Sequence, residues 1–510
     1  MSNRDVSATW LYHDGTKHSV QSVRANQHML DWSNQPLPYK IYTSLAPIPL
    51  PSDFAPSTLL ALDALARTGA EPAGPRLPDL AAIARLCYFS NGITKVLRFT
   101  GGEMPFRAAA CTGALFHIEH YVVCGDLPAL PAGVYHYGPH DHALRQLRAG
   151  DYRALLVEAT GAEPAVAAAP AVIAQTTTYW RNAWKYQARA YRHAYWDDGT
   201  VLANLLAVAA ANDLPTRVVL GFADDVVNAL LDVDPAHEAA ISLVAVGQTD
   251  AAPPPAPQVA PLGLPTERLS HHQIDYPAIR AMHAASSLES GAEAAAWHGA
   301  AAPAPFPPPA GPLVPLQPLA PDAQPTDPIE TVIRRRGSSR QFTREPISYA
   351  QLSTVLDRST RGFAADFLAP GQPLTDLYVI ADAVDGLEAG TYVLHRAERA
   401  LERLAAGDCR DQAGFLDLGQ ELAADAAVNC YWLVDLEPVL ARFGNRGYRV
   451  AQLDAAIEAG KQYLACYALR LGATGLTFFD DDVTAFFAPH AAGKSVLFLM
   501  ALGRPLRRRA

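Results

Sequence analysis

The chain has 510 residues, half of them apolar, which is enough to bury at least two sizeable cores and excludes a small disulfide-stapled scaffold. A formal net charge of -10 argues against a nucleic-acid-binding surface, which needs clustered Lys and Arg. The six cysteines show no CxxC pair and no zinc-like spacing, so we expect reduced thiols and no metal site.

Residues 1–69 are expected to form an N-terminal extension. The opening sequence, MSNRDVSATW, lacks a basic region followed by an apolar one. No run in the chain approaches the ~18 apolar residues of a membrane span. We therefore expect a cytoplasmic protein with no membrane partner.

Residues 70–250 are predicted to form a domain that mixes helices and strands. No βαβαβ alternation and no GxGxxG motif occur in it, which argues against a Rossmann domain. Hydrophobic periodicity and β-branched residues predict, in chain order, a helix at 80–90, strands at 120–125, 134–138 and 170–177, a long helix at 201–212 and a strand at 241–247.

Residues 251–327 are predicted to be a linker. Two stretches rich in Pro and Ala flank a short amphipathic segment at 276–290. Because proline lacks a backbone donor and has a fixed φ, the flanking stretches are expected to be extended connectors.

Residues 328–510 are predicted to be a second copy of the first domain. WKYQARAYR at 184–192 returns 257 positions later as ARFGNRGYR at 441–449, and AGVYHY at 132–137 returns as AGTYVL at 389–394. Such matches, spread over about a hundred positions, indicate a duplication. We expect an α+β fold in which the copies pack as an intramolecular pseudo-dimer, because a surface that once paired with itself can pair with its duplicate.

Two further groups are interpreted as structural. The acidic runs at 224–225 and 480–482 match between the copies and are expected to cap helix N-termini. The histidines at 117, 120, 136, 140 and 142 lack an accompanying cluster of acids or cysteines, so turn and surface positions are favoured over a metal site.

A basic segment, IRRRGSSRQF at 333–342, opens the second copy. Arg336, Ser338 and Arg340 are spaced two positions apart, just before a predicted helix. Guanidinium groups and a hydroxyl suit a phosphomonoester dianion, whereas a solvated linker end is the alternative that these residues alone leave open.

This segment, together with Gly503-Arg504 after the last predicted strand, resembles the nitroreductase superfamily, in which such residues hold the phosphate of FMN. The first copy resembles one branch, the SagB-type (ThcOx-type) dehydrogenases. Its SNGIT at 90–94, WKYQARAYRHAYWDDG at 184–199 and LGFADD at 220–225 follow the order of that branch. The resemblance implies two tandem nitroreductase-like domains that bind FMN.

The resemblance also implies a flavin-binding loop in the first copy. Cys111 stands where the family usually has serine, which puts one flavin contact in doubt, and glycine permits close backbone approach to a flat ring. A redox role for this cysteine is disfavoured because no resolving partner or nearby base is visible. The implied flavin-contacting residues are Arg107, Cys111, Thr112, Gly113 and Ala114.

The two copies differ in what they retain. The second copy has Arg336, Ser338, Arg340 and Arg504, whereas the first ends in Gly247-Gln248 and has no RxSxR ahead of it. The glycine loop is found only in the first copy. In this superfamily the flavin lies at a dimer interface, so the resemblance implies one composite FMN site per chain.

Lys185 and Tyr186 are the implied catalytic pair, replaced by Arg442 and Phe443 in the second copy. In SagB-type enzymes such a pair serves azoline oxidation, in which a base removes a proton and hydride leaves for the flavin. A lysine acts as a base only if its pKa falls toward neutrality, and a tyrosine hydroxyl can relay or orient the proton. A surface pair at a helix start is the structural alternative.

The resemblance thus implies an FMN-dependent dehydrogenase that converts thiazolines or oxazolines to azoles in peptide natural-product biosynthesis. Its implied partners are a peptide or carrier-bound azoline, a cyclodehydratase or synthetase, and dioxygen as electron acceptor. Two alternatives remain open. One is an NAD(P)H-dependent nitro- or quinone-reductase-like flavoenzyme, and the other is a non-catalytic scaffold subunit of a synthetase complex.

Overall fold

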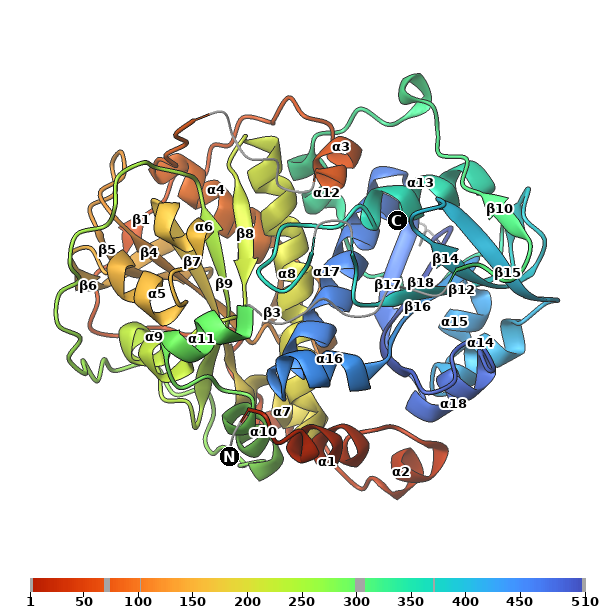
Figure 1. The fold of residues 1–510 in the computed structure, drawn as a ribbon, viewed down its shortest axis with the longest axis horizontal. Helices are drawn as coiled ribbons and strands as arrows, with labels where there is room; N and C mark the ends of the chain where they lie inside the picture. Colours follow the sequence, from red (N-terminus) through yellow and green to blue (C-terminus); the bar gives the residue numbers. More distant parts are fainter. Residues whose placement is uncertain (1–2, 68–73, 101, 299–307, 370–371, 507–510) are drawn as a thin grey trace.

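The computed structural model describes residues 3–67, 74–100, 102–298, 308–369 and 372–506. The described chain folds into two lobes, each built on a seven-stranded sheet covered by helices (Figure 1). The expected α+β class in two tandem copies is therefore confirmed.

The first sheet belongs to the first half of the chain, and all of its neighbouring strands run antiparallel. Alternating β-branched, aromatic and alanine side chains bury both faces of its central strands. The strands lie in the order β1 (Ile48–Pro49), β6 (Ala143–Ala149), β5 (Gly133–Gly138), β4 (Ile118–Cys124), β7 (Ala171–Thr178), β9 (Glu238–Val246) and β8 (Thr216–Val219).

The second sheet repeats this order strand for strand. It runs β10 (Leu313–Pro315), β15 (Ala400–Ala406), β14 (Gly390–His395), β12 (Asp376–Ala381), β16 (Val428–Val434), β18 (Ser495–Gly503) and β17 (Gly472–Leu476). Two small pairs stand outside the sheets, β2 (Ile93–Phe99) with β3 (Gly102–Arg107) and β11 (Ile347–Ser348) with β13 (Val384–Asp385).

The helices of the first half and of the linker pack partly on the first sheet and partly on elements of the second half. They are α1 (Ser7–Gly15), α2 (Val20–Ala25), α3 (Ala61–Ala66), α4 (Leu80–Asn91), α5 (Arg153–Ala159), α6 (Pro164–Ala168), α7 (Tyr179–Tyr186), α8 (Ala190–Ala211), α9 (Asp224–Leu231), α10 (Pro277–Ala285) and α11 (Gly291–His298). Short 3-10 turns lie at Trp32–Asn34, Thr112–Ala114, Gln187–Arg189 and Pro321–Ala323.

The helices of the second half follow the same plan. They are α12 (Ile329–Arg335), α13 (Tyr349–Ser359), α14 (Arg410–Leu416), α15 (Glu421–Asp425), α16 (Leu436–Phe443), α17 (Arg446–Ala468) and α18 (Asp480–Phe486). Helix α8 starts well before the predicted 201, because its first turns are aromatic and charged and yet buried, which the Ala/Leu pattern does not reveal.

Helices α8 and α17 lie side by side at the centre of the molecule (Figure 1). A β-carbon added to Gly199 would lie 2.4 Å from Cβ of Ala456, and one added to Gly460 would lie 2.6 Å from Cβ of Ala203. Each of these residues thus contacts its own duplicate, 257 positions away. Contact between equivalent residues is the mark of a twofold axis, so the chain forms an intramolecular pseudo-dimer.

Two buried ion clusters join the halves. Asp480 accepts from Arg192 at 2.7 Å, and Asp224 accepts from Arg449 at 2.7 Å. The arginines lower the pKa of each carboxyl group to about 2 against the cost of burial. The acidic residues lie in the first turns of α9 and α18, but the N-cap residues are Ala223 and Phe479 and neither helix has a side-chain cap, so the expected capping is wrong. The carboxylates of Asp224 and Asp480 pair instead with arginines of the opposite half.

The N-terminal extension and the linker carry equivalent helices. On one cluster, the carbonyl of His13 accepts from Arg192 and the hydroxyl of Thr16 accepts from the same side chain. On the other, the carbonyl of His283 and the hydroxyl of Ser286 accept from Arg449. Helices α1 and α10 therefore fill counterpart positions in the pseudo-dimer.

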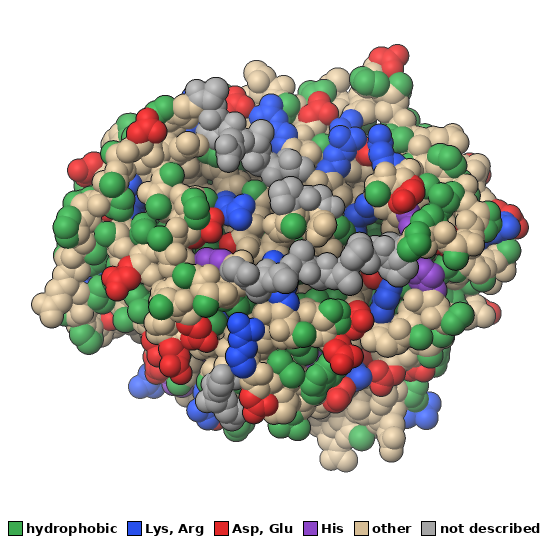
Figure 2. All heavy atoms as spheres, in the orientation of Figure 1, with side chains coloured by type: hydrophobic (Ala, Val, Ile, Leu, Met, Phe, Trp, Pro, Cys, Tyr) green, Lys and Arg blue, Asp and Glu red, His purple; other side chains and the backbone are tan. Residues whose placement is uncertain are grey.

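The described surface is mixed in character. Basic and acidic side chains are interspersed on the face that Figure 2 shows. Among the described residues, no helix is both long and apolar enough to cross a bilayer.

Candidate active site

The glycine loop of the first half lies under the end of α7. A β-carbon added to Gly113, whose φ is +66°, would lie 2.8 Å from the hydroxyl oxygen of Tyr186. Lys185 is half-buried, with its Nζ 5.3 Å from the centroid of the Tyr186 ring. The structure therefore brings the predicted loop and the predicted catalytic pair together.

A turn at Gln187 places Tyr186 over the loop. Gln187 has φ +52° and ψ -140°, and it separates α7 from α8. Its counterpart Gly444 has φ +67° and ψ -156°, so the same turn occurs in both copies. A non-glycine residue in this conformation costs about 1 kcal/mol or more, which the packing around α7 must offset.

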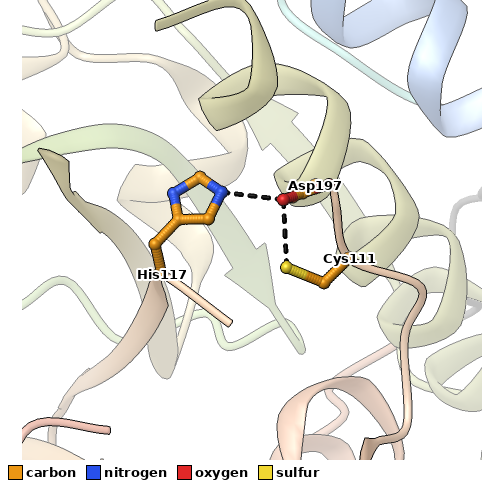
Figure 3. Close-up of side chains that lie close together, drawn as sticks. All are labelled: Cys111, His117 and Asp197. Carbon is orange, nitrogen blue, oxygen red and sulfur yellow. Dashed lines mark hydrogen bonds and ion pairs between the residues drawn. The ribbon is translucent and has the colours of Figure 1, made fainter. Parts of the chain in front are cut away.

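Asp197 of α8 fixes the glycine loop (Figure 3). Its Oδ1 accepts from the Thr112 amide and from the Thr112 hydroxyl, both at 2.8 Å, while its Oδ2 accepts from the Cys111 thiol at 3.0 Å. The Nε2 of His117 lies 2.7 Å from the same Oδ2. Four donors from three residues thus hold the loop to the central helix.

The cluster of Cys111, His117 and Asp197 corrects two expectations from the sequence. One was that no base lies near Cys111, and the other was that the histidines lie in turns or on the surface. Asp197 and His117 are neighbours of Cys111 that the sequence did not reveal, but they do not activate the thiol, because burial and the Asp197 charge raise the Cys111 pKa. His117, His120 and His136 are fully buried rather than at turns or on the surface, since each has a polar partner within the core, respectively Asp197, Ser90 and Glu119.

The basic segment of the second half reaches across to the same loop. Arg336 donates to the carbonyl of Ala108 at 2.9 Å and to that of Arg107 at 3.2 Å. The Ser338 hydroxyl lies 3.2 Å from the Tyr463 hydroxyl, which in turn accepts from the Gly475 amide at 2.6 Å. The segment therefore links β3 of one half to β17 of the other.

Arg340 is exposed and has no hydrogen bond or ion pair with another residue in the described ranges. Its positive charge nevertheless lowers the pKa of Tyr186, although burial, together with Asp197 and Cys111, raises that pKa overall. The Tyr186 hydroxyl therefore keeps its proton at neutral pH and is available as a hydrogen-bond donor.

The aromatic side chains of α8 close the arrangement. The Tyr186 ring stands edge-on to His193 at 4.6 Å, His193 contacts Trp196 at 4.9 Å, and Trp196 contacts Phe478 at 5.8 Å and Phe498 at 5.7 Å. A β-carbon on Gly475 would lie 3.4 Å from Phe498. Closed by the main chain from Ala108, which Arg336 contacts, to Gly113, these contacts form a circuit of Gly113, Tyr186, His193, Trp196, Phe478, Phe498, Gly475, Tyr463, Ser338 and Arg336.

Both glycines of the circuit, Gly113 and Gly475, are exposed to solvent. Next to Gly475, the backbone amides of Thr477 and Phe478 donate to no partner in the described part of the chain, and the buried hydroxyl of Thr477 is also without a partner there. The circuit thus presents free N–H and O–H donors beside flat aromatic rings.

In the opposite half, the chain itself occupies the equivalent positions. Asp366 accepts from the amides of Leu220 at 3.0 Å and Gly221 at 2.7 Å, the counterparts of Thr477 and Phe478. Trp297 packs on Phe443 at 4.8 Å and donates to its carbonyl. Only one of the two pseudo-symmetric positions is therefore open.

Two predicted residues lie apart from the circuit. The guanidinium of Arg107 is buried and donates to Asn91 and to the Ile118 carbonyl, so only its main chain meets Arg336. Arg504 is exposed at the end of β18, where its Nε donates to the carbonyl of Pro346. Ala114 is half-buried in the 3-10 turn that holds Gly113.

Comparison with known proteins identifies the class. The model of the nitroreductase family matches residues 108–248 and 333–504, one stretch in each half. The chain therefore belongs to the nitroreductase family, whose members are oxidoreductases that generally bind a flavin.

Individual relatives include one full-length structure. A crystal structure of a protein from Anabaena variabilis, named as a nitroreductase, is 26% identical, with a TM-score of 0.77 over 98% of this chain and 99% of that one. A protein from Methanocaldococcus jannaschii, also named as a nitroreductase, is 25% identical over 184 residues, which are 35% of this chain and 91% of that protein.

A further relative is the trifolitoxin-processing protein TfxB of Rhizobium leguminosarum bv. trifolii. It is 31% identical over 166 residues, which are 32% of this chain. The chain spans 44% of the length of TfxB.

A flavin suits the donor set of the circuit. Its ring needs flat contacts and N–H donors for its carbonyls and ring nitrogens, and its phosphate needs cations and hydroxyls. The aromatic residues, the amides of Thr477 and Phe478, and Ser338 with Arg340 supply groups of each kind. At the equivalent positions of the counterpart half, the amides of Leu220 and Gly221 donate to Asp366, and no RxSxR segment precedes that half in the sequence.

Proposed function

We propose that the chain is a SagB-type, FMN-dependent dehydrogenase that oxidises thiazoline or oxazoline rings to azoles in the biosynthesis of a peptide natural product. The observation that carries the proposal is the position of Tyr186 over Gly113, beside Lys185, in the one open circuit. The counterpart half has Phe443 and Arg442 and is filled by its own side chains.

One FMN per chain follows from this arrangement. Ser338, Arg340 and Arg504 are proposed to hold the phosphate, with Arg336 joining their segment to the glycine loop through the carbonyl of Ala108. The ring would contact the loop residues Cys111, Thr112, Gly113 and Ala114 and the amides of Thr477 and Phe478. Arg107 is proposed to contribute through its backbone.

The proposed reaction removes one proton and one hydride from neighbouring ring carbons, which leaves a new C=C bond in an aromatic azole. When bound, FMN accepts the hydride with its electron pair. Lys185 is the proposed base that takes the proton, and the protonated Tyr186 hydroxyl donates a hydrogen bond that orients the ring. Dioxygen is proposed as the final acceptor of the two electrons.

One relative favours azoline oxidation over the reduction of nitro compounds or quinones. TfxB is named for processing a peptide toxin, and it is 31% identical where the two match. A peptide or carrier-bound azoline, delivered by a cyclodehydratase or synthetase partner, is accordingly the proposed substrate.

The proposal is tested by purifying the protein with FMN and removing oxygen. A thiazoline peptide should bleach the flavin absorbance, with the thiazole as product, while NADPH should not. Bleaching by NADPH and not by thiazolines would favour a nitro- or quinone-reductase-like enzyme, as the names of the Anabaena and Methanocaldococcus proteins suggest. A colourless protein that takes up no FMN would favour a scaffold role.

A further inference from the structure

A cavity of about 310 Å³ opens against the first turn of α7, the helix that ends in Lys185 and Tyr186. Tyr179, Trp180 and Ala183 of that helix line one side of it. Ile274 and Tyr276, from the segment that leads into α10, line the other side. The cavity is therefore built by the catalytic helix and the linker together.

One apolar cluster of side chains lies between the cavity and the circuit. Trp180, Trp184 and Leu115 form one apolar cluster, and both Tyr276 and Tyr186 pack against it. On α7, Ala183 and Tyr186 are three residues apart and share a face of the helix. The side chain of Tyr276, which lines the cavity, and that of Tyr186, which lies over the Gly113 loop, therefore pack against the same cluster.

The three aromatic residues Tyr179, Trp180 and Tyr276 have no aromatic counterparts in the other half. Tyr179 and Trp180 correspond, 257 positions later, to Leu436 and Glu437. Tyr276 corresponds to Val6, because α10 and α1 are counterparts. The aromatic residues are therefore present in the half that keeps Lys185 and absent from the half that lacks it.

The charged side chains at the rim of the cavity neutralise each other, which favours an uncharged ligand. Asp275 and Arg280 lie on the linker side, and their side chains are paired with each other at 2.6 Å. Aromatic rings prefer offset or edge-on contact with another ring, which the three rings of the lining offer. The chemistry of the cavity thus suits a neutral aromatic group.

We infer that this cavity is a specificity subsite that binds an aromatic side chain of the peptide substrate near the ring undergoing oxidation. The inference rests on the proposed function. Along the helix axis, Trp180 and Lys185 are separated by about 7.5 Å, or about two residues of an extended peptide. The aromatic residue is therefore expected about two positions from the azoline.

The test uses two thiazoline peptides that differ only in carrying Phe or Ala two positions from the ring. With the FMN-loaded enzyme, the Phe peptide should show a KM about tenfold lower at a similar kcat. Tyr276→Ala should abolish that difference, and Ile274→Trp, which narrows the cavity from a half-exposed position, should reduce it. Val6→Ala, the matched control in the other half, should preserve it.

A second measurement separates this inference from the proposed function. Saturation-transfer NMR with N-acetylphenylalaninamide and N-acetylalaninamide reports binding without any oxidation. Preferential binding of the aromatic amide, lost in Tyr276→Ala, supports the subsite even if neither thiazoline peptide is oxidised. If both peptides are oxidised with equal KM, or if neither amide is preferred, the subsite is refuted while the proposed oxidation is judged on its own result.

Discussion

The hydroxyl of Tyr186 lies so close to Gly113 that a β-carbon on that glycine would be 2.8 Å from the hydroxyl oxygen. This contact joins the end of α7 to the loop that Asp197 holds, so the proposed catalytic pair and the proposed flavin loop form one rigid unit. The counterpart of Tyr186, Phe443, has no hydroxyl and instead packs against Trp297. Under the proposed function, chemistry is confined to one side of the pseudo-dimer.

Lys185→Ala is expected to leave FMN bound and to lower turnover of a thiazoline peptide by about 100-fold or more, because the loss of a positioned base costs a factor of that order. Flavin absorbance per chain measures cofactor content, and anaerobic bleaching measures turnover. Arg442→Ala, at the counterpart position, is the matched control and should turn over normally. Normal turnover by Lys185→Ala would contradict the assignment of the base.

Asp197→Ala is expected to weaken FMN binding by about tenfold or more, because the loop loses the four hydrogen bonds that Cys111, Thr112 and His117 donate. Asp454, the counterpart on α17, accepts from Thr375 at 2.9 Å. Asp454→Ala should lose stability but keep FMN affinity. Titration of the two FMN-free variants with FMN measures their affinities for the cofactor. Equal losses of affinity in both variants would show that Asp197→Ala acts only through folding.

The sequence predicts the duplication, the pairing of the halves and the residues of the glycine loop. Each of these depends on residues that match, or fail to match, between the two copies. It does not reveal the role of Asp197, although WDDG was part of the matched segment, since a carboxylate in a helix gives no sign of its partners. The sequence also does not reveal that α1 and α10 occupy equivalent positions in the two halves. Much of it rests on main-chain carbonyls, such as those of His13 and His283, which any residue provides.

Gly475→Val is expected to fold normally but to bind FMN at least tenfold more weakly. Its new β-carbon would lie 3.4 Å from Phe498, an ordinary contact, while the methyl groups would occupy the circuit. The counterpart residue is Val218, whose amide donates to the carbonyl of Ala364. Val218→Gly should therefore leave FMN content unchanged. If Gly475→Val binds FMN as tightly as the parent protein, the flavin does not lie at this edge of β17.

Acid is expected to weaken the joint between the halves in a defined range of pH. Against the cost of burial, Arg189 and Arg192 lower the pKa of Asp480 from 3.8 to about 2, so its contribution to stability is complete above about pH 4 and is lost as the pH falls toward 2. At pH 7, Asp480→Asn leaves Arg189 and Arg192 buried without their carboxylate, which should cost about 3–5 kcal/mol in the free energy of unfolding.

The measurement for this prediction is urea unfolding of the parent protein and Asp480→Asn at pH 7, 5 and 3. The difference between the two proteins should be constant from pH 7 to 5 and should shrink at pH 3, because only the parent protein still has a carboxylate to protonate. Asp481→Asn is the control, since Asp481 is exposed and pairs with Lys17 at the surface, where such a pair contributes less than about 1 kcal/mol. A difference that stayed constant down to pH 3 would mean that the Asp480 carboxylate does not link folding to pH.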